Sequence, residues 1–174
     1  MGIDVRPATR EDTDGIQHVA ERAWHSAHAP IIGAETTDEF LERYYDAATF
    51  RSLFEDDDSI LGVAVEDGKT GKEKTEAAVV GFVGASPTDG DSATFDLGRI
   101  YVLPSRWREG IGDRLLSHAE RTVADRGGER IRLGVMAENE RAIEFYESAG
   151  YRRDEKFYDE RIDTSGYVYV KELS

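Results

Sequence analysis

The alternation of apolar and polar positions predicts helices early in the chain and strands after them. A short strand at residues 5–8 is followed by apolar residues that recur at helical spacing from about residue 10 into the twenties. Thr9, with Asp12 three residues later, forms a variant of the capping box that opens helices. Pro30 and Gly33 are expected to break this first helix.

A second helix is predicted to begin at Thr36, with Glu39 three residues later, and to end before the acidic run at residues 56–58. Its apolar face consists of Phe40, Leu41, Tyr44 and Tyr45. The period then changes to that of strands, and the first two strands form an antiparallel hairpin. These strands are predicted at residues 60–65, 78–83 and 93–103, with polar segments at 67–76 and 87–91 between them.

The second half of the chain predicts two more helices between strands. Residues 110–126 form a strongly amphipathic helix that stops at Gly127 and Gly128. The remaining elements are a strand at 131–135, a helix at 139–149 capped by Gly150, and a final hairpin of strands at about 151–162 and 166–172.

This order of elements predicts one α/β (α+β) domain spanning residues 1–174. The unit from residue 93 to residue 137 is a strand, a helix and a strand, which needs a right-handed crossover if the two strands are parallel neighbours. The other strands form meanders. We therefore expect a three-layer fold with a mixed, mostly antiparallel sheet of six to seven strands, flanked by about four helices, and not a doubly wound sheet.

Composition excludes several classes of function. The chain has no cysteine, which excludes disulfides, thiolate metal sites and cysteine nucleophiles. Its net charge of −14 makes nucleic acid and anionic membranes poor partners. No apolar run approaches a membrane span, and the first residues lack the layout of a signal peptide, so a cytoplasmic location is expected. High Asp and Glu with 17 Arg and 5 Lys is also typical of halophilic proteins, although acidity also serves plain solubility.

The most informative segment is residues 96–116, a strand followed by a tight loop and a helix that opens on Gly110 and Gly112. A helix N-terminus carries unpaired N–H groups and a partial positive charge, so it suits a phosphate. Arg106, Arg108 and Arg114 add positive charge. The segment matches neither a dinucleotide fingerprint nor a P-loop, because it lacks the third glycine and the G-K-[ST] triplet.

This segment resembles the acetyl-CoA signature of the GNAT superfamily of N-acyltransferases. The family pattern is a strand ending in V-x-P, then [QR]-x-x-G-x-[GA], then a helix; here these are residues 102–104 and 107–112. Residues 139–151 are similar to the family's second pattern, N-x-x-A-x-x-F-Y-x-x-x-G-[FY]. The strong similarity covers about residues 96–151, and the opening at residues 5–12 also looks like a GNAT start.

The resemblance implies an acetyl-CoA-dependent N-acetyltransferase that acts on a primary amine by direct attack, without a metal or a covalent enzyme intermediate. Tyr146 would protonate the departing thiolate, and the Val102 amide would face the thioester oxygen. The acceptor is expected to be a small amine rather than a protein, and a homodimer is possible. The residues implied in acetyl-CoA binding are Ile100, Tyr101, Val102, Trp107, Arg108, Glu109, Gly110, Ile111, Gly112, Asn139 and Tyr146.

Two departures from the family pattern concern the loop and the base. Trp107 replaces the usual Gln or Arg, which is tolerable if the loop binds through backbone N–H groups. Asp96 is the candidate general base, because many members carry a Glu on the same strand. Gly134 occupies the position where the ribosomal-protein alanine acetyltransferases carry a Glu, which disfavours a peptide N-terminal acetyltransferase.

Each candidate also has a simpler explanation. Tyr146 could be a core tyrosine, Asn139 only an N-cap, and Asp96 a carboxylate that faces solvent. His25 and His28 share a helical face at metal-ligand spacing without an evident third ligand, so no metal is expected, and either could border the acceptor pocket. A non-catalytic acyl-CoA-binding module and a peptide or protein N-terminal acetyltransferase are therefore the alternative functions.

Overall fold

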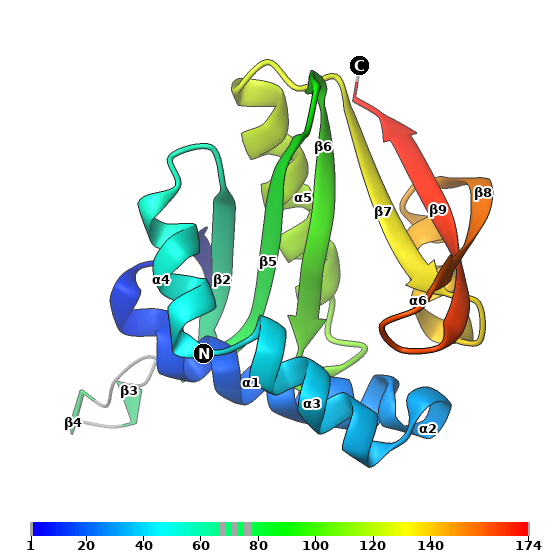
Figure 1. The fold of residues 1–174 in the computed structure, drawn as a ribbon. Helices are drawn as coiled ribbons and strands as arrows, with labels where there is room; N and C mark the ends of the chain where they lie inside the picture. Colours follow the sequence, from blue (N-terminus) through cyan, green and yellow to red (C-terminus); the bar gives the residue numbers. More distant parts are fainter. Residues whose placement is uncertain (1, 67–68, 71–72, 75–77, 174) are drawn as a thin grey trace.

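The computed structural model describes residues 2–66, 69–70, 73–74 and 78–173. Its centre is a seven-stranded mixed sheet with the order β1-β2-β5-β6-β7-β9-β8 (Figure 1). All neighbours are antiparallel except β6 and β7, which confirms the mixed, mostly antiparallel sheet predicted from the order of elements. The strands are β1 Ile3–Pro7, β2 Ile60–Glu66, β5 Ala78–Thr88, β6 Asp91–Val102, β7 Arg130–Met136, β8 Arg152–Asp159 and β9 Thr164–Glu172.

Helices cover both faces of the sheet, which confirms the predicted three layers. In Figure 1 the four N-terminal helices lie on one face, while the two later helices lie on the other. The described residues contain six α-helices, where about four were expected. They are α1 Thr13–Ala27, α2 Ala29–Ile32, α3 Ala34–Tyr44, α4 Ala47–Glu55, α5 Ile111–Asp125 and α6 Glu140–Ser148.

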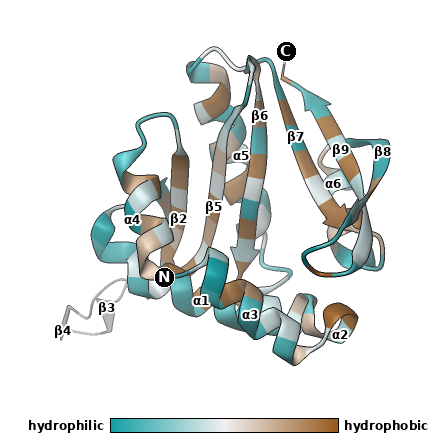
Figure 2. Ribbon diagram, viewed as in Figure 1, coloured by the Kyte–Doolittle hydropathy of each residue, from teal (hydrophilic) through white to brown (hydrophobic). Residues whose placement is uncertain are grey.

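The core is accordingly split into two clusters by the sheet. On one face the apolar stripe of α5, including Leu115 and Ala119, packs on β2, β5 and β6. On the other face Trp24 and its neighbours on α1 pack on β5 and β6. Figure 2 shows hydrophobic stretches in the central strands and on the inner faces of these helices, while β8 is largely hydrophilic. The sheet thus separates the two clusters, and the opening between β6 and β7 connects its two faces.

The predicted parallel unit forms as expected but pairs over a short length. Phe95 and Asp96 of β6 pair with Ile131 and Arg132 of β7, and no pair follows Asp96. Two residues later β6 contains a β-bulge, because the register with β5 passes from Leu97 to Arg99 and leaves Gly98 unpaired. A bulge bends a strand and increases its twist. The bend carries β6 away from β7, and the two strands diverge towards their carboxyl ends (Figure 1).

The prediction of one long second helix was wrong. The chain forms α3 and α4 instead, and Asp46 starts the second of them by accepting hydrogen bonds from the Thr49 amide and hydroxyl at 2.9 and 2.6 Å. α3 begins after Gly33, so Thr36 is not its N-cap. Pro30 does not end a helix either, since it lies in the first turn of α2, where its missing N–H costs nothing.

The remaining sequence predictions are largely confirmed. The strands at 60–66 and 78–88 pair antiparallel, and the last two strands form a hairpin. The polar loop predicted at residues 67–76 lies partly outside the described residues, and within it two-residue strands, β3 Lys69–Thr70 and β4 Glu73–Lys74, pair antiparallel. Within the described part of the chain, no helix combines the length and the apolar character that crossing a bilayer requires.

The capping box at Thr9 supports a prediction on stability. The Asp12 carboxylate accepts hydrogen bonds from the Thr9 amide and from both terminal nitrogens of Arg6, at 2.8–3.1 Å. Burial opposes ionisation of this carboxyl, but these hydrogen bonds outweigh it and lower its pKa. We expect Asp12→Asn to lower the free energy of unfolding at pH 7 by about 1–2 kcal/mol.

Because the pKa of Asp12 is lower in the folded state, its contribution is present at neutral pH and is lost as pH falls through the folded pKa. Urea unfolding of wild type and Asp12→Asn should therefore differ fully at pH 7 and progressively less below about pH 4, the ordinary range of aspartate. A difference that stays constant down to pH 3 would contradict the assignment.

Candidate active site

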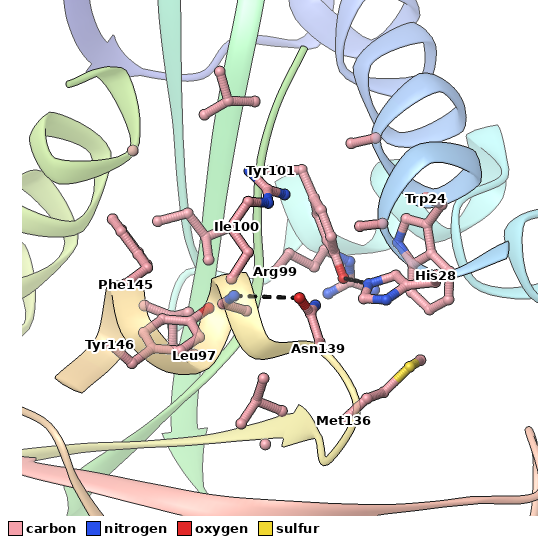
Figure 3. A pocket seen from close by; sticks show the side chains of 18 of the residues that line it. Trp24, His28, Leu97, Arg99, Ile100, Tyr101, Met136, Asn139, Phe145 and Tyr146 are labelled. Carbon is pink, nitrogen blue, oxygen red and sulfur yellow. Dashed lines mark hydrogen bonds between the residues drawn. The ribbon is translucent and has the colours of Figure 1, made fainter. Parts of the chain in front are cut away.

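A large cavity lies where β6 and β7 separate. It has a volume of about 590 Å³ and reaches both faces of the sheet. β6 and the loop before α5 form one wall, β7 and α6 the opposite wall, and α1 closes one end. Figure 3 shows Trp24 and His28 at one side, Phe145 and Tyr146 at the other, and residues of β6 between them. The cavity thus connects the two predicted motifs with the N-terminal helices.

The open edge of β6 presents backbone groups to this cavity. The Leu103 amide donates to the Val80 carbonyl on β5 at 2.9 Å. Since successive residues of a strand direct their backbone groups to opposite sides, the N–H and C=O groups of Ile100 and Val102 point away from β5, into the gap. An extended chain with amide groups could pair with them like an added strand.

Side chains of β6 divide between the two faces of the sheet. Ile100 and Val102 pack with the cluster under α5 and α6, whereas Tyr101 packs with the cluster under α1. Arg99 lies on the same side as Tyr101, with its guanidinium carbon 5.2 Å from the Tyr45 ring centroid. The bulge at Gly98 shifts by one residue which face of the sheet each later side chain of β6 points to. Arg99 and Tyr101 therefore share one face of the sheet.

The loop before α5 has the backbone shape expected of an anion site. Gly110, the N-cap of α5, has φ +80, and Arg108 also has a positive φ of 68. The first N–H groups of α5 have no partner within the helix and point to the cavity with the positive end of its dipole. A Cβ on Gly112 would lie 3.3 Å from the Phe145 ring, so this glycine lets α5 and α6 approach closely at the cavity wall.

Trp107 has a defined role despite its departure from the family pattern. Its indole N–H donates to the Val102 carbonyl at 2.9 Å. The guanidinium of Arg141 lies over its ring, 3.2 Å from the centroid. A tryptophan here therefore fixes the end of β6 and holds a cation of α6 beside the loop, which a smaller residue could not do.

The arginines around the loop differ in their partners. Arg108 and Arg141 form no ion pair with a carboxylate in the described part of the chain, and both line the cavity. Burial, together with the charge of Arg108, lowers the pKa of Arg141. Arg106 is instead paired with Glu66 and Glu109. The two unpaired guanidinium groups are suited to a phosphate, which supplies the missing negative charge.

Two residues of the predicted phosphate site lie elsewhere. The Arg114 side chain donates to the Ile3 carbonyl on β1 at 2.6 Å, so it does not bring to the cavity the positive charge that the sequence predicted. Glu109 is not among the cavity-lining residues, and its carboxylate contacts Arg106 at 3.0 Å. The other residues implied in acetyl-CoA binding all line the cavity: Ile100, Tyr101, Val102, Trp107, Arg108, Gly110, Ile111, Gly112, Asn139 and Tyr146.

Tyr146 and Asn139 come from α6 and its N-terminus. The Tyr146 side chain is buried between Phe145 and Tyr151, with ring centroids 5.2 and 5.8 Å away, and it lines the cavity. Burial raises the pKa of Tyr146, and Tyr45 adds to this rise, so the hydroxyl keeps its proton at neutral pH. Asn139 caps α6 by accepting from the Ala142 amide at 3.2 Å, as Figure 3 shows.

Asp96 does not join this group. It lies at the last pair of the parallel ladder, opposite Arg132, and accepts a hydrogen bond from that arginine's Nε at 2.9 Å. It is not among the residues that line the cavity. The geometry therefore gives no support to its predicted role as general base, because the divergence of the strands begins only after it.

An aromatic cluster at the α1 end was not anticipated as a unit. His28 Nε2 lies 3.3 Å from the Tyr101 hydroxyl, and Trp24 stacks on Phe40 with centroids 4.5 Å apart. His25 contacts Asp38 at 2.7 Å, so the two histidines make different contacts. Burial lowers the pKa of His28 to about 4, with the charge of Arg141 acting in the same direction, so this imidazole is neutral at pH 7.

Comparison with known proteins assigns the family. The model of the acetyltransferase (GNAT) family matches residues 19–151, most of the chain. The chain belongs to the GNAT acetyltransferase family. The match spans both GNAT motifs and the N-terminal helices that close the cavity. The mixed sheet and its flanking helices are the GNAT fold, and the cavity lies in this fold at the opening between β6 and β7.

Similar proteins from two microorganisms are named as N-acetyltransferases. An uncharacterized N-acetyltransferase of Mycobacterium tuberculosis is 28% identical over 93% of this GNAT chain and 98% of its own length. A spermidine N(1)-acetyltransferase of Thermoplasma acidophilum is 22% identical over 99% of this chain and 97% of its own. The crystal structure of the PaiA N-acetyltransferase of Thermoplasma acidophilum in complex with coenzyme A matches with a TM-score of 0.81, 21% identity and 99% coverage of both chains.

Proposed function

We propose that this protein transfers an acetyl group from acetyl-CoA to the primary amine of a small molecule, by direct attack within a ternary complex. One observation carries the proposal: a single cavity joins the N-terminus of α5, the unpaired Arg108 and Arg141 beside it, the open edge of β6 and Tyr146. The named relatives are N-acetyltransferases, and one structural neighbour is described with coenzyme A, which supports the same donor.

The residues present fit this donor. Ile100 offers its N–H and C=O groups, and Val102 its N–H, on the open edge for the amide groups of a pantetheine arm, while the Val102 carbonyl accepts from Trp107. The N–H groups that open α5, with Arg108 and Arg141 beside them, suit the phosphates. Asn139 borders the same channel and can contribute its side-chain amide.

The chemistry needs an oxyanion donor and an acid. The acceptor nitrogen attacks the thioester carbonyl carbon, the C–S bond breaks, and the sulfur leaves with the bonding electron pair. The Val102 N–H, which points into the gap, stabilises the negative charge that develops on the carbonyl oxygen. Tyr146 gives its proton to the departing sulfur, and the nitrogen loses a proton to water to form the amide.

The decisive test combines binding with transfer. Calorimetry should show micromolar binding of acetyl-CoA, about −8 kcal/mol. A panel of primary amines should then release CoA thiol, which is measured without background because the protein has no cysteine. Binding without thiol release from any amine would instead indicate the non-catalytic acyl-CoA-binding module, and thiol release only with peptides would indicate an N-terminal acetyltransferase.

The two unpaired arginines give a quantitative prediction. We expect the double variant Arg108→Gln/Arg141→Gln to raise the Kd for acetyl-CoA about 10- to 100-fold, because two charge-assisted contacts to phosphate are lost. The affinity of the variant should also depend less on salt than that of the wild type. Both are measured by calorimetry at two KCl concentrations.

Arg114→Gln is the matched control for that variant. It removes one positive charge from α5, close to the loop that carries Arg108, but the Arg114 side chain faces β1 and does not line the cavity. Its Kd for acetyl-CoA should stay within about twofold of wild type. Equal losses in the control and the double variant would mean that general charge, and not a phosphate site, explains the effect.

A further inference from the structure

Arg99 has no carboxylate partner among the described residues. It lies at the α1 end of the cavity, away from the phosphate loop, and we call this the acceptor end. Its Nε is buried and makes no hydrogen bond, and its Nη2 donates only a long 3.4 Å bond to the Tyr44 carbonyl. No carboxylate of the described residues lies within ion-pair distance of it. The side chain is partly buried and lines the cavity, so its uncompensated guanidinium is suited to a negatively charged ligand.

The other charged residues at this end of the cavity also favour a negatively charged ligand. Arg161 also lines the cavity, and its guanidinium stacks over Phe40 at 5.4 Å. The nearby Asp159 is occupied, because it accepts hydrogen bonds from Arg161 Nε and Nη2 at 3.0 and 2.7 Å. The neutral His28 adds no charge. The two other acidic residues of the lining, Asp113 and Glu144, belong to α5 and α6 on the donor side.

We propose that the acceptor is an amino carboxylate, a small primary amine whose own carboxylate binds Arg99, as an α-amino acid would. This inference rests on the proposed acetyltransferase function. The planar guanidinium matches a carboxylate in two parallel hydrogen bonds, so it orients the ligand as well as binding it. A polyamine would instead bring a second positive charge to an end of the cavity where Asp159, the acidic residue of the described lining there, is already paired with Arg161, which disfavours it.

The walls around Arg99 suit an apolar side chain on this acceptor. Trp24, Phe40, Tyr101 and Met136 line the same end, and Figure 3 shows Trp24, His28, Tyr101 and Met136 around it. Aromatic rings bury large apolar area at little entropic cost. The acceptor class is therefore an amino acid with an apolar or aromatic side chain, held by its carboxylate at Arg99 and by its side chain on these rings.

The test compares two amines that differ by the carboxylate. Phenylalanine and phenethylamine are assayed with acetyl-CoA by thiol release on wild type and Arg99→Gln. We expect wild type to prefer phenylalanine in kcat/KM, and Arg99→Gln to raise the KM for phenylalanine about 10- to 100-fold while changing phenethylamine less than about threefold. The two amines differ in basicity and so in intrinsic reactivity. We therefore compare the ratio of their kcat/KM values between wild type and Arg99→Gln, because intrinsic reactivity cancels in that comparison.

Arg43→Gln is the matched control, since Arg43 is an exposed cation of α3 outside the cavity. The ratio should not change in this variant, and Arg99→Lys should lose less of it than Arg99→Gln. Calorimetry with acetyl-CoA reports whether each variant is folded. Phenylalanine titrated into the CoA-loaded protein gives a second reading, in which wild type binds and Arg99→Gln binds at least about tenfold more weakly.

The outcomes separate the two proposals. Efficient acetylation of phenethylamine or spermidine, with equal effects of Arg99→Gln on both members of the pair, would overturn the amino carboxylate inference and leave the transferase standing. Absence of thiol release with every amine, on protein that binds acetyl-CoA, would overturn the transferase and this inference with it.

Discussion

The variant Tyr146→Phe is expected to lower kcat by about 100- to 1,000-fold and to leave the Kd for acetyl-CoA within about threefold, because general acids contribute on this scale. The Tyr146 ring packs between Phe145 and Tyr151, and phenylalanine preserves these contacts. Only the hydroxyl that lines the cavity is lost, so the effect falls on the step in which sulfur departs. Steady-state thiol release and calorimetry measure the two quantities.

Tyr151→Phe provides a matched control for this variant. Tyr151 is also buried, but its hydroxyl donates to Glu120 at 2.9 Å and it does not line the cavity. The same deletion there should cost stability and leave kcat nearly unchanged. If Tyr146→Phe keeps wild-type turnover, Tyr146 is not the acid and is a core residue, the simpler interpretation of an aromatic on a helical face.

The protonation state of Tyr146 adds a second check on its role. Burial raises the pKa of this phenol above its ordinary value near 10. Its proton is therefore present throughout the physiological range, and the rate should show no fall below pH 10 caused by ionisation of Tyr146. A loss of activity near pH 8 that disappears in Tyr146→Phe would contradict this assignment.

Gly112→Glu should raise the Kd for acetyl-CoA by at least about 100-fold, because a like charge facing a phosphate costs several kcal/mol. A side chain at this position also meets the Phe145 ring, since the Cβ alone would lie 3.3 Å from it. The substitution thus combines a steric change at the cavity wall with a negative charge at the positive end of α5. Calorimetry against acetyl-CoA measures the loss.

Ser117→Glu is the control for charge on the same helix. Ser117 is exposed on α5 and does not line the cavity, so an added carboxylate there should leave the Kd within about twofold of wild type. Thermal unfolding of both variants separates a folding defect from a binding defect. Wild-type affinity in a well-folded Gly112→Glu protein would mean that the donor phosphates do not bind at the start of α5.

Local sequence signals predicted the parts of the site that depend on local backbone shape. The two glycines that open α5, the cap at Asn139 and the strand that ends before Pro104 are all recognisable from neighbouring residues, because caps and turns are decided within a few positions. The same holds for the capping box at Thr9. Asp46 was an equally local signal for the start of α4 that the apolar face of the predicted second helix obscured.

The cavity itself depends on distances that no local pattern contains. Asp96 and Tyr101 lie on one strand, yet the first is held in the closed ladder by Arg132 and the second borders the cavity, because the bulge at Gly98 lies between them. Alternation along β6 could have placed Arg99 beside Tyr101 and opposite Ile100. It could not have shown that, among the residues the structure describes, no carboxylate lies within ion-pair distance of Arg99.

The sequence by itself thus determined the family resemblance, the order of elements and the backbone of the phosphate loop, since each follows from short-range preferences and a motif of contiguous residues. Only the tertiary structure decided which charges are paired. Arg114 turns to Ile3 and Arg106 to its glutamates, while Arg108 and Arg141 meet across two elements. Pairing is a property of side chains brought together from distant positions, so it appears only when the layers pack.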